Sequence, residues 1–184
     1  MKRLLILYFV LCFPFIQSLC IAQSKYKADD GFVSFFSSAP LEDIYAENKT
    51  VKSLIDLSTN EIAFIVQVQN FKFKKSLMQK HFNEKYMESH KYPHATFSGF
   101  VKSSSNITIT GRHSVTVKGE MLIHGVKKTI EVVGVLINNG TSISANSEFI
   151  IKVDDYDIKI PKLLVKNIAE EVKVTLQLNY ELLK

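Results

Sequence analysis

The sequence predicts an all-β protein: an antiparallel, up-and-down β-barrel of about eight strands with one amphipathic helix near the barrel mouth. Apolar and polar residues alternate along most of the chain, as in strands with one buried face. Turn-forming residues separate these stretches, and one stretch alone follows a helical pattern. An open sheet would expose its apolar face to water, so the sheet must close. A two-sheet sandwich would also bury that face, but the hairpin-by-hairpin order favours a barrel.

The chain begins with the features of a secretory signal peptide. Lys2 and Arg3 precede an uncharged apolar run that ends at Ala22, a small residue of the kind a signal peptidase reads. We therefore expect a signal peptide over residues 1–22, a single domain over residues 23–184, and a periplasmic or secreted protein. The alternative is a retained membrane anchor, because the run is long enough to span a bilayer with tilt.

Composition limits the disulfides, the number of domains and the kinds of partner that can be expected for the chain left after cleavage. Cleavage removes both cysteines, so no disulfide is expected, and the roughly 160 residues left suit one domain with a sizeable core. Loss of Lys2 and Arg3 lowers the net charge from +5 to +3. Charges of both signs are scattered, and Arg112 is the single arginine left. This pattern argues against a nucleic-acid partner.

Three strands are expected in the first part of the domain, at residues 32–37, 51–57 and 62–69. After the first strand, Pro40 suits the first turn of a helix, and a short helical turn is expected through Leu41, Ile44 and Tyr45. The third strand has one entirely apolar face, made of Ile62, Phe64, Val66 and Val68.

The helical pattern begins at Ser76. Ser76 and Gln79 have the spacing of a capping box, in which each side chain satisfies a backbone N–H of the first turn. The helix must end before Pro93, which disfavours a helical residue in front of it. Its apolar face consists of Met78, Phe82 and Tyr86. We expect this face to lie across the barrel mouth.

Six further strands are expected, at about residues 95–102, 106–110, 113–123, 127–137, 142–153 and 171–182. Asn139-Gly140 is the strongest hairpin signal between these strands. His124 falls in another turn, where we expect its side chain to be solvated. The strand at 127–137 is apolar on both faces, so something must cover its outside. A partner in a homodimer would do so, but the loop at 158–168 is the simpler expectation.

The barrel interior is expected to be either filled or hollow, because eight strands enclose about enough space for side chains or one small ligand. The absence of Trp and several small inward-facing residues favour a cavity. The alternative is a solid core in which the glycines serve strand curvature. The small residues are Ala95, Gly99, Gly119, Gly134, Ala145 and Ser147.

Motifs for catalysis or metal binding are missing from the sequence. His81, His90 and His94 are close in sequence, but Pro93 interrupts the helical spacing and no cysteine accompanies them, so no metal site is expected. There is no Gly-x-Ser-x-Gly elbow, and adjacent Asp154 and Asp155 would point to opposite faces of a strand. We expect neither an enzyme nor a cofactor.

Three motifs carry a resemblance to a known family. They are the Lys-Tyr-Pro-x-Ala-x-Phe passage at 91–97, a glycine-bounded hairpin passage at 119–125, and the acidic-aromatic sequence at 155–158. In this order and spacing the chain resembles the YceI-like family of exported lipid- or polyisoprenoid-binding proteins, which have a lipocalin-like barrel. The resemblance departs at 31–35, which lacks the His that commonly opens the first strand of the family.

The resemblance implies an apolar channel that holds a long-chain isoprenoid or fatty-acyl molecule. The expected lining is Phe64, Val66, Val68, Met78, Phe82, Tyr86, Phe97, Met121, Phe149 and Ile151, and an anionic headgroup would suit Arg112 and His113. The alternative function is a non-enzymatic structural or stress-related interaction protein with a filled barrel core.

Overall fold

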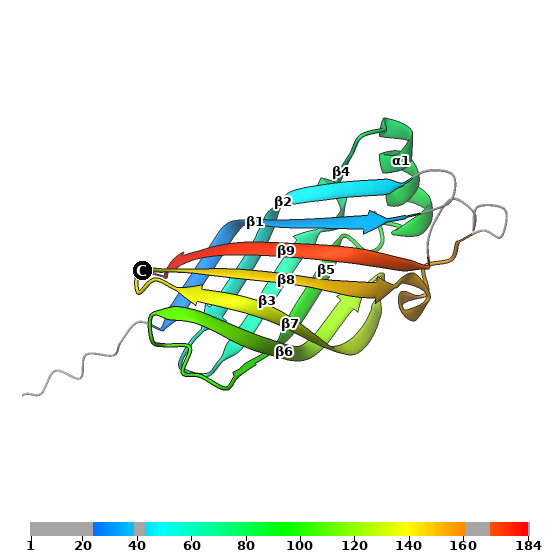
Figure 1. Cartoon of the computed structure of the whole chain (residues 1–184). Helices are drawn as coiled ribbons and strands as arrows, with labels where there is room; N and C mark the ends of the chain where they lie inside the picture. The colour runs from blue at the N-terminus through cyan, green and yellow to red at the C-terminus, as the bar shows by residue number, and fades with distance from the viewer. Residues whose placement is uncertain (1–23, 39–42, 161–169, 184) are drawn as a thin grey trace, which may run out of the picture.

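Eight long antiparallel strands close into a barrel, and one short strand, β4, is added at its edge (Figure 1). The computed structural model describes residues 24–38, 43–160 and 170–183. The strands are β1 (Lys25–Ser37), β2 (Ile44–Asp56), β3 (Glu61–Gln67), β4 (Lys72–Phe73), β5 (His94–Ser103), β6 (Gly111–Ile123), β7 (Val126–Asn138), β8 (Ser142–Lys152) and β9 (Glu171–Leu182). The predicted fold class is confirmed.

The barrel is closed by β1, which pairs with β2 on one side and β9 on the other. The order around the sheet is β1-β9-β8-β7-β6-β5-β3-β2, so most neighbours in space are also neighbours in sequence. The register of β1 shifts around Gly31, and a Cβ there would collide with the Leu178 side chain. Glycine therefore allows the barrel to close tightly at this position.

Residues 72–92 form a segment over one end of the barrel, which we call the lid segment (Figure 1). It contains β4, the helix α1 (Ser76–His81) and a wider helical turn, η2 (Phe82–Tyr86). The helix begins at Ser76 as predicted, but the capping box is wrong. Lys75 is the N-cap and no side chain caps the helix, because Ser76 already has helical geometry. Gln79 instead accepts a hydrogen bond from the Phe73 backbone N–H at 3.4 Å.

Three local predictions were also wrong. Ile44 and Tyr45 belong to β2, because they pair with β1, while Pro40 and Leu41 lie outside the described residues. Residues 106–110 form turns, since the Asn106 side chain accepts hydrogen bonds from the N–H and hydroxyl of Thr108. The third strand stops at Gln67 and continues as a 3-10 turn, η1 (Val68–Asn70).

The outer face of β7 remains open in the described part of the chain. Val133 is 69% exposed, so the described residues of the expected covering loop, 158–160, leave it uncovered. The rest of that loop lies outside the described residues. The homodimer expected as an alternative cover stays a prediction.

Several of the most fully buried side chains lie toward the end of the barrel opposite the lid segment. Ile143, Leu136 and Leu178 are almost fully buried there, together with Tyr180. The Tyr180 hydroxyl lies 2.8 Å from Ser53 Oγ, which donates in turn to the Ala63 carbonyl oxygen at 2.8 Å.

None of the helices in the described part of the chain has both the length and the hydropathy needed to span a bilayer.

Candidate functional site

An apolar cavity of about 440 Å³ occupies the lid end of the barrel. Its walls come from β1, β2, β3, β5, β6, β8 and β9, and the lid segment covers it. Among the lining residues in the described part of the chain, only Ser37, His81 and Tyr86 carry polar side-chain groups. Burial raises the pKa of the Tyr86 phenol, so this group stays neutral at physiological pH. The expectation of a filled core therefore fits the opposite end of the barrel and not this one.

The cavity brings together all the predicted lining residues except Phe97. These residues are Phe64, Val66, Val68, Met78, Phe82, Tyr86, Met121, Phe149 and Ile151. They meet because alternate residues of each strand face inward, and because Met78, Phe82 and Tyr86 share the underside of the lid segment. Whether they contact a ligand stays a prediction.

Phe97 lies behind the main cavity, against a second cavity of about 50 Å³ deeper in the barrel. The Phe64 and Phe97 rings stack with their centroids 5.1 Å apart and an angle of 15° between them. A Cβ at residue 119 would collide with the Ser98 carbonyl oxygen and lie 2.8 Å from Phe97 Cζ, so Gly119 allows the β5 backbone and this ring to approach closely. Four residues line both cavities and separate them: Phe64, Met121, Phe149 and Leu176.

Four phenylalanines form a cluster between the lid segment and the barrel wall. Phe82 contacts Phe35, Phe71 and Phe73 at centroid distances of 5.5, 5.6 and 5.0 Å. Sequence reasoning identified Phe82 but missed its three partners. The alternation of Phe71 and Phe73 beside the helix was an available signal, but only the fold shows that β1 supplies Phe35 to the same cluster.

The three motifs that carried the family resemblance meet at one place, which we call the clamp. His124 lies in the β6–β7 turn, with Nε2 3.1 Å from Glu88 Oε2 and Nδ1 3.1 Å from the Tyr156 carbonyl oxygen. The Tyr92 ring packs edge-on against the imidazole at a centroid distance of 4.6 Å. Tyr156 belongs to a 3-10 turn, η3 (Val153–Tyr156), after β8.

The clamp corrects the expectation of a solvated His124, whose side chain is only 9% exposed. Glu88, His124 and Asp157 also have positive φ angles, of 41°, 50° and 53°. Such angles are uncommon for residues other than glycine, and they persist where surrounding contacts hold them. The clamp therefore fixes the far end of the lid segment to the barrel.

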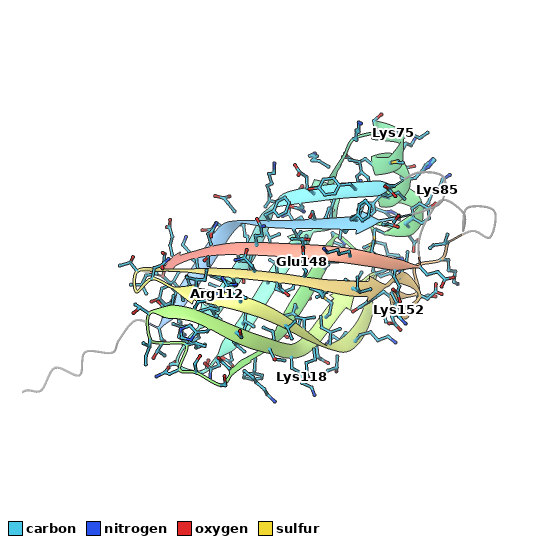
Figure 2. The ribbon with its side chains drawn as sticks, viewed as in Figure 1. Lys75, Lys85, Arg112, Lys118, Glu148 and Lys152 are labelled. Carbon is cyan, nitrogen blue, oxygen red and sulfur yellow. The ribbon has the colours of Figure 1, made fainter. Side chains whose placement is uncertain are left out.

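Arg112 and His113 lie far from the cavity. They begin β6 at the opposite end of the barrel, and Figure 2 shows Arg112 well away from Lys75 and Lys85 of the lid segment. Nine residues of extended chain separate Arg112 from Met121 at the cavity, about 30 Å. His113 is buried, with Nδ1 2.7 Å from Ser105 Oγ and Nε2 2.8 Å from the Ile109 carbonyl oxygen. Both ring nitrogens of His113 thus have partners within the β5–β6 loop. The positions of Arg112 and His113 therefore do not support a role in binding the headgroup of a ligand in this cavity.

Titratable groups elsewhere do not assemble into a metal site within the described residues. His81 lines the cavity, whereas His90 and His94 are exposed. Asp154 and Asp155 lie in η3 rather than in a strand, and Asp155 is 3.6 Å from the Lys128 ammonium. These carboxylates are turn residues at the edge of the clamp.

Comparison with solved structures shows the same fold in three proteins of low sequence identity. A polyisoprenoid-binding domain from Saccharophagus degradans implicated in plant cell wall breakdown has a TM-score of 0.75 and 18% identity, over 88% of this chain and 99% of that one. Burkholderia cenocepacia BcnA has a TM-score of 0.68 and 16% identity, over 81% and 95%. The Campylobacter jejuni YCEI protein has a TM-score of 0.57 and 14% identity, over the whole of both chains.

No curated protein sequence matches this chain. The YceI-like domain family, by contrast, matches residues 32–180, which include every strand from β2 to β8, the second half of β1 and most of β9. The matched region contains the cavity, the lid segment and the clamp. The chain belongs to the YceI-like domain family.

Proposed function

We propose that the protein is an exported carrier that holds a long-chain isoprenoid or fatty-acyl molecule in the barrel cavity. The observation that carries the proposal is the apolar cavity of about 440 Å³ beneath the lid segment. This volume lies in the range of ligand pockets, which are mostly apolar with few polar groups. The polyisoprenoid-binding domain from Saccharophagus degradans, which shares the fold, supports the same class of ligand.

Burial of an aliphatic chain would supply the binding free energy. Each methylene transferred from water into an apolar site contributes about 0.8 kcal/mol. Met78, Met121 and the phenylalanine side chains offer apolar area without polar groups that would need partners. Binding would therefore depend on the chain of the ligand more than on its headgroup.

The proposed role is sequestration or transport, without catalysis or a cofactor. The charged leader over residues 1–22 would direct the domain over residues 23–184 to the periplasm or the medium. Export of this kind is consistent with the family. For this role, the lid segment needs only to let the ligand enter and leave the cavity.

Native mass spectrometry of the purified mature protein, followed by organic extraction, tests the proposal. We expect a co-purifying apolar molecule that extraction removes. The chain has no Trp, so Phe82→Trp provides a single fluorophore beneath the lid. Its emission should shift when a fatty acid or an isoprenoid alcohol is added to the extracted protein.

The matched control is Phe100→Trp, which places the fluorophore on the outer face of β5, where Phe100 is 52% exposed. Its emission should not respond. An empty protein as purified, together with a Phe82→Trp signal that neither ligand class changes, would show that the barrel is not a lipid carrier.

A further inference from the structure

The lid segment carries a concentration of positive charge that we call the basic rim. It consists of Lys72, Lys74, Lys75, Lys80 and Lys85, all of which are exposed. Between residues 72 and 85 the sequence contains a single acidic residue, Glu84. Lys75 and Lys85 project from the lid end of the molecule (Figure 2). The rim therefore has a net charge of about +4 at neutral pH.

Exposed apolar side chains lie beside these lysines. Leu77 is 61% exposed and lies on the same side of α1 as Lys80, whereas Met78 lines the cavity. Phe36 and Tyr45 face each other across β1 and β2 and are 40% and 47% exposed. Aromatic and aliphatic side chains among lysines are typical of surfaces that enter the headgroup region of a bilayer.

The acidic neighbour of the rim already has partners. Glu47 lies opposite Lys72 across the β2–β4 pairing. Its carboxylate is 2.9 Å from the Lys49 ammonium and accepts a hydrogen bond from the Tyr45 hydroxyl at 3.1 Å. Glu47 therefore offsets little of the charge on Lys72.

Two lysines at the opposite end of the barrel have carboxylate partners instead. Lys27 lies 2.7 Å from Asp29, and Lys25 lies 3.9 Å from Asp56. The lid segment thus carries a local excess of positive charge over residues 72–85. This distribution of charge favours contact between the lid segment and an anionic partner.

We propose that the basic rim, with Leu77, Phe36 and Tyr45, docks the protein on an anionic lipid bilayer, where the cavity exchanges its ligand with the membrane. This inference rests on the proposed function. The same short helix supplies Met78 to the cavity and Leu77 to the docking face, and none of its residues is fully buried. Contact with the bilayer on one side of α1 can therefore alter the cover of the cavity on the other.

Co-sedimentation of the mature protein with vesicles tests the docking face. We expect binding to phosphatidylcholine vesicles that contain phosphatidylglycerol, weak binding to phosphatidylcholine alone, and a loss of binding as salt rises. Each lysine near an anionic surface contributes about a fivefold gain in partitioning, so Lys74→Gln/Lys80→Gln should bind about 25-fold more weakly. Leu77→Ser should further weaken the binding that persists in high salt.

The matched control is Lys102→Gln/Arg112→Gln, which removes the same charge from exposed positions at the opposite end of the barrel. It should bind within about twofold of the wild type, because these groups would lie beyond a Debye length from the membrane. Equal losses in both double variants, or equal binding to neutral and anionic vesicles, would overturn the proposed docking face.

Lipid content gives a second, separate readout. Lys74→Gln/Lys80→Gln should co-purify with as much apolar ligand as the wild type, because neither lysine lines the cavity. A wild type that is empty but binds anionic vesicles through the rim would overturn the proposed ligand and support the docking face. A loaded wild type that ignores anionic vesicles would overturn the docking face and leave the ligand standing.

Discussion

His124 Nε2 lies 3.1 Å from Glu88 Oε2, and this contact ties the β6–β7 turn to the end of the lid segment. The other ring nitrogen faces the Tyr156 carbonyl oxygen at the same distance. Both partners are hydrogen-bond acceptors, and the imidazole lies between them. The imidazole thereby connects three segments that are distant in sequence.

Replacing His124 by Ala should loosen the lid segment. The loss of the two partly buried His124 contacts should lower the free energy of unfolding by about 1–3 kcal/mol. Hydrogen exchange measured by mass spectrometry should rise at residues 82–92 more than in β8 or β9. His90→Ala, at an exposed position, is the control. Unchanged exchange at residues 82–92 would show that the clamp does not hold the lid.

Replacing Phe64 by Ala should join the two cavities, because Phe64 lines both and stacks on Phe97. We expect the preference of the protein to shift toward longer fatty acids, measured by competition with the Phe82→Trp reporter. Removal of a core phenylalanine costs about 3–5 kcal/mol, so Phe64→Leu provides a milder variant with the same expected direction. Ile65→Ala, on the outer face of β3, should leave chain-length preference unchanged.

Replacing Asp56 by Asn should change the pH dependence of stability. Asp56 Oδ1 accepts hydrogen bonds from the hydroxyls of Ser24 and Ser58 at 2.8 and 2.6 Å, and from the Ser58 N–H at 2.8 Å. Hydrogen bonds to Ser58 and Ser24 lower the pKa of Asp56 from 3.8 to about 2. A lowered pKa stabilises the folded state above the unfolded-state value, and this contribution disappears as the pH falls from about 4 to 2.

Chemical denaturation across this pH range measures the effect. The Asn variant should be less stable by about 1–2 kcal/mol at pH 7, and the difference from the wild type should vanish near pH 2. Asp30→Asn, at an exposed position, should not reproduce this dependence. A constant difference between pH 7 and pH 2 would contradict the explanation.

Replacing Tyr180 by Phe should destabilise the filled end of the barrel. Burial raises the pKa of Tyr180, and its neutral hydroxyl lies 2.8 Å from Ser53 Oγ. We expect a loss of about 1 kcal/mol in thermal or chemical unfolding, because Ser53 still donates to the Ala63 carbonyl oxygen. Ser53→Ala should cost more, since it leaves the buried tyrosine hydroxyl without this partner. Tyr45→Phe, at a 47% exposed position, should have little effect.

Local sequence patterns predicted the fold well where a strand has one buried face and one exposed face. In β9, Val174, Leu178 and Tyr180 are buried as their alternation requires. Asn139-Gly140 turns between β7 and β8, with Gly140 at a φ of 86°. Predictions failed where long-range pairing prevailed over local preference, as at Ile44 and Tyr45, which β1 draws into β2.

The sequence by itself determined the alternating strands, their hairpin order and the apolar underside of the lid segment, because each depends on residues two to four positions apart. Only the tertiary structure decided that the lid end is hollow, that Phe64 lies between two cavities, and that Arg112 lies far from the main cavity. It also decided that His124 joins Glu88 to Tyr156. The physical reason is that cavity volume and the clamp depend on side chains from distant strands meeting across the barrel, which no local period encodes.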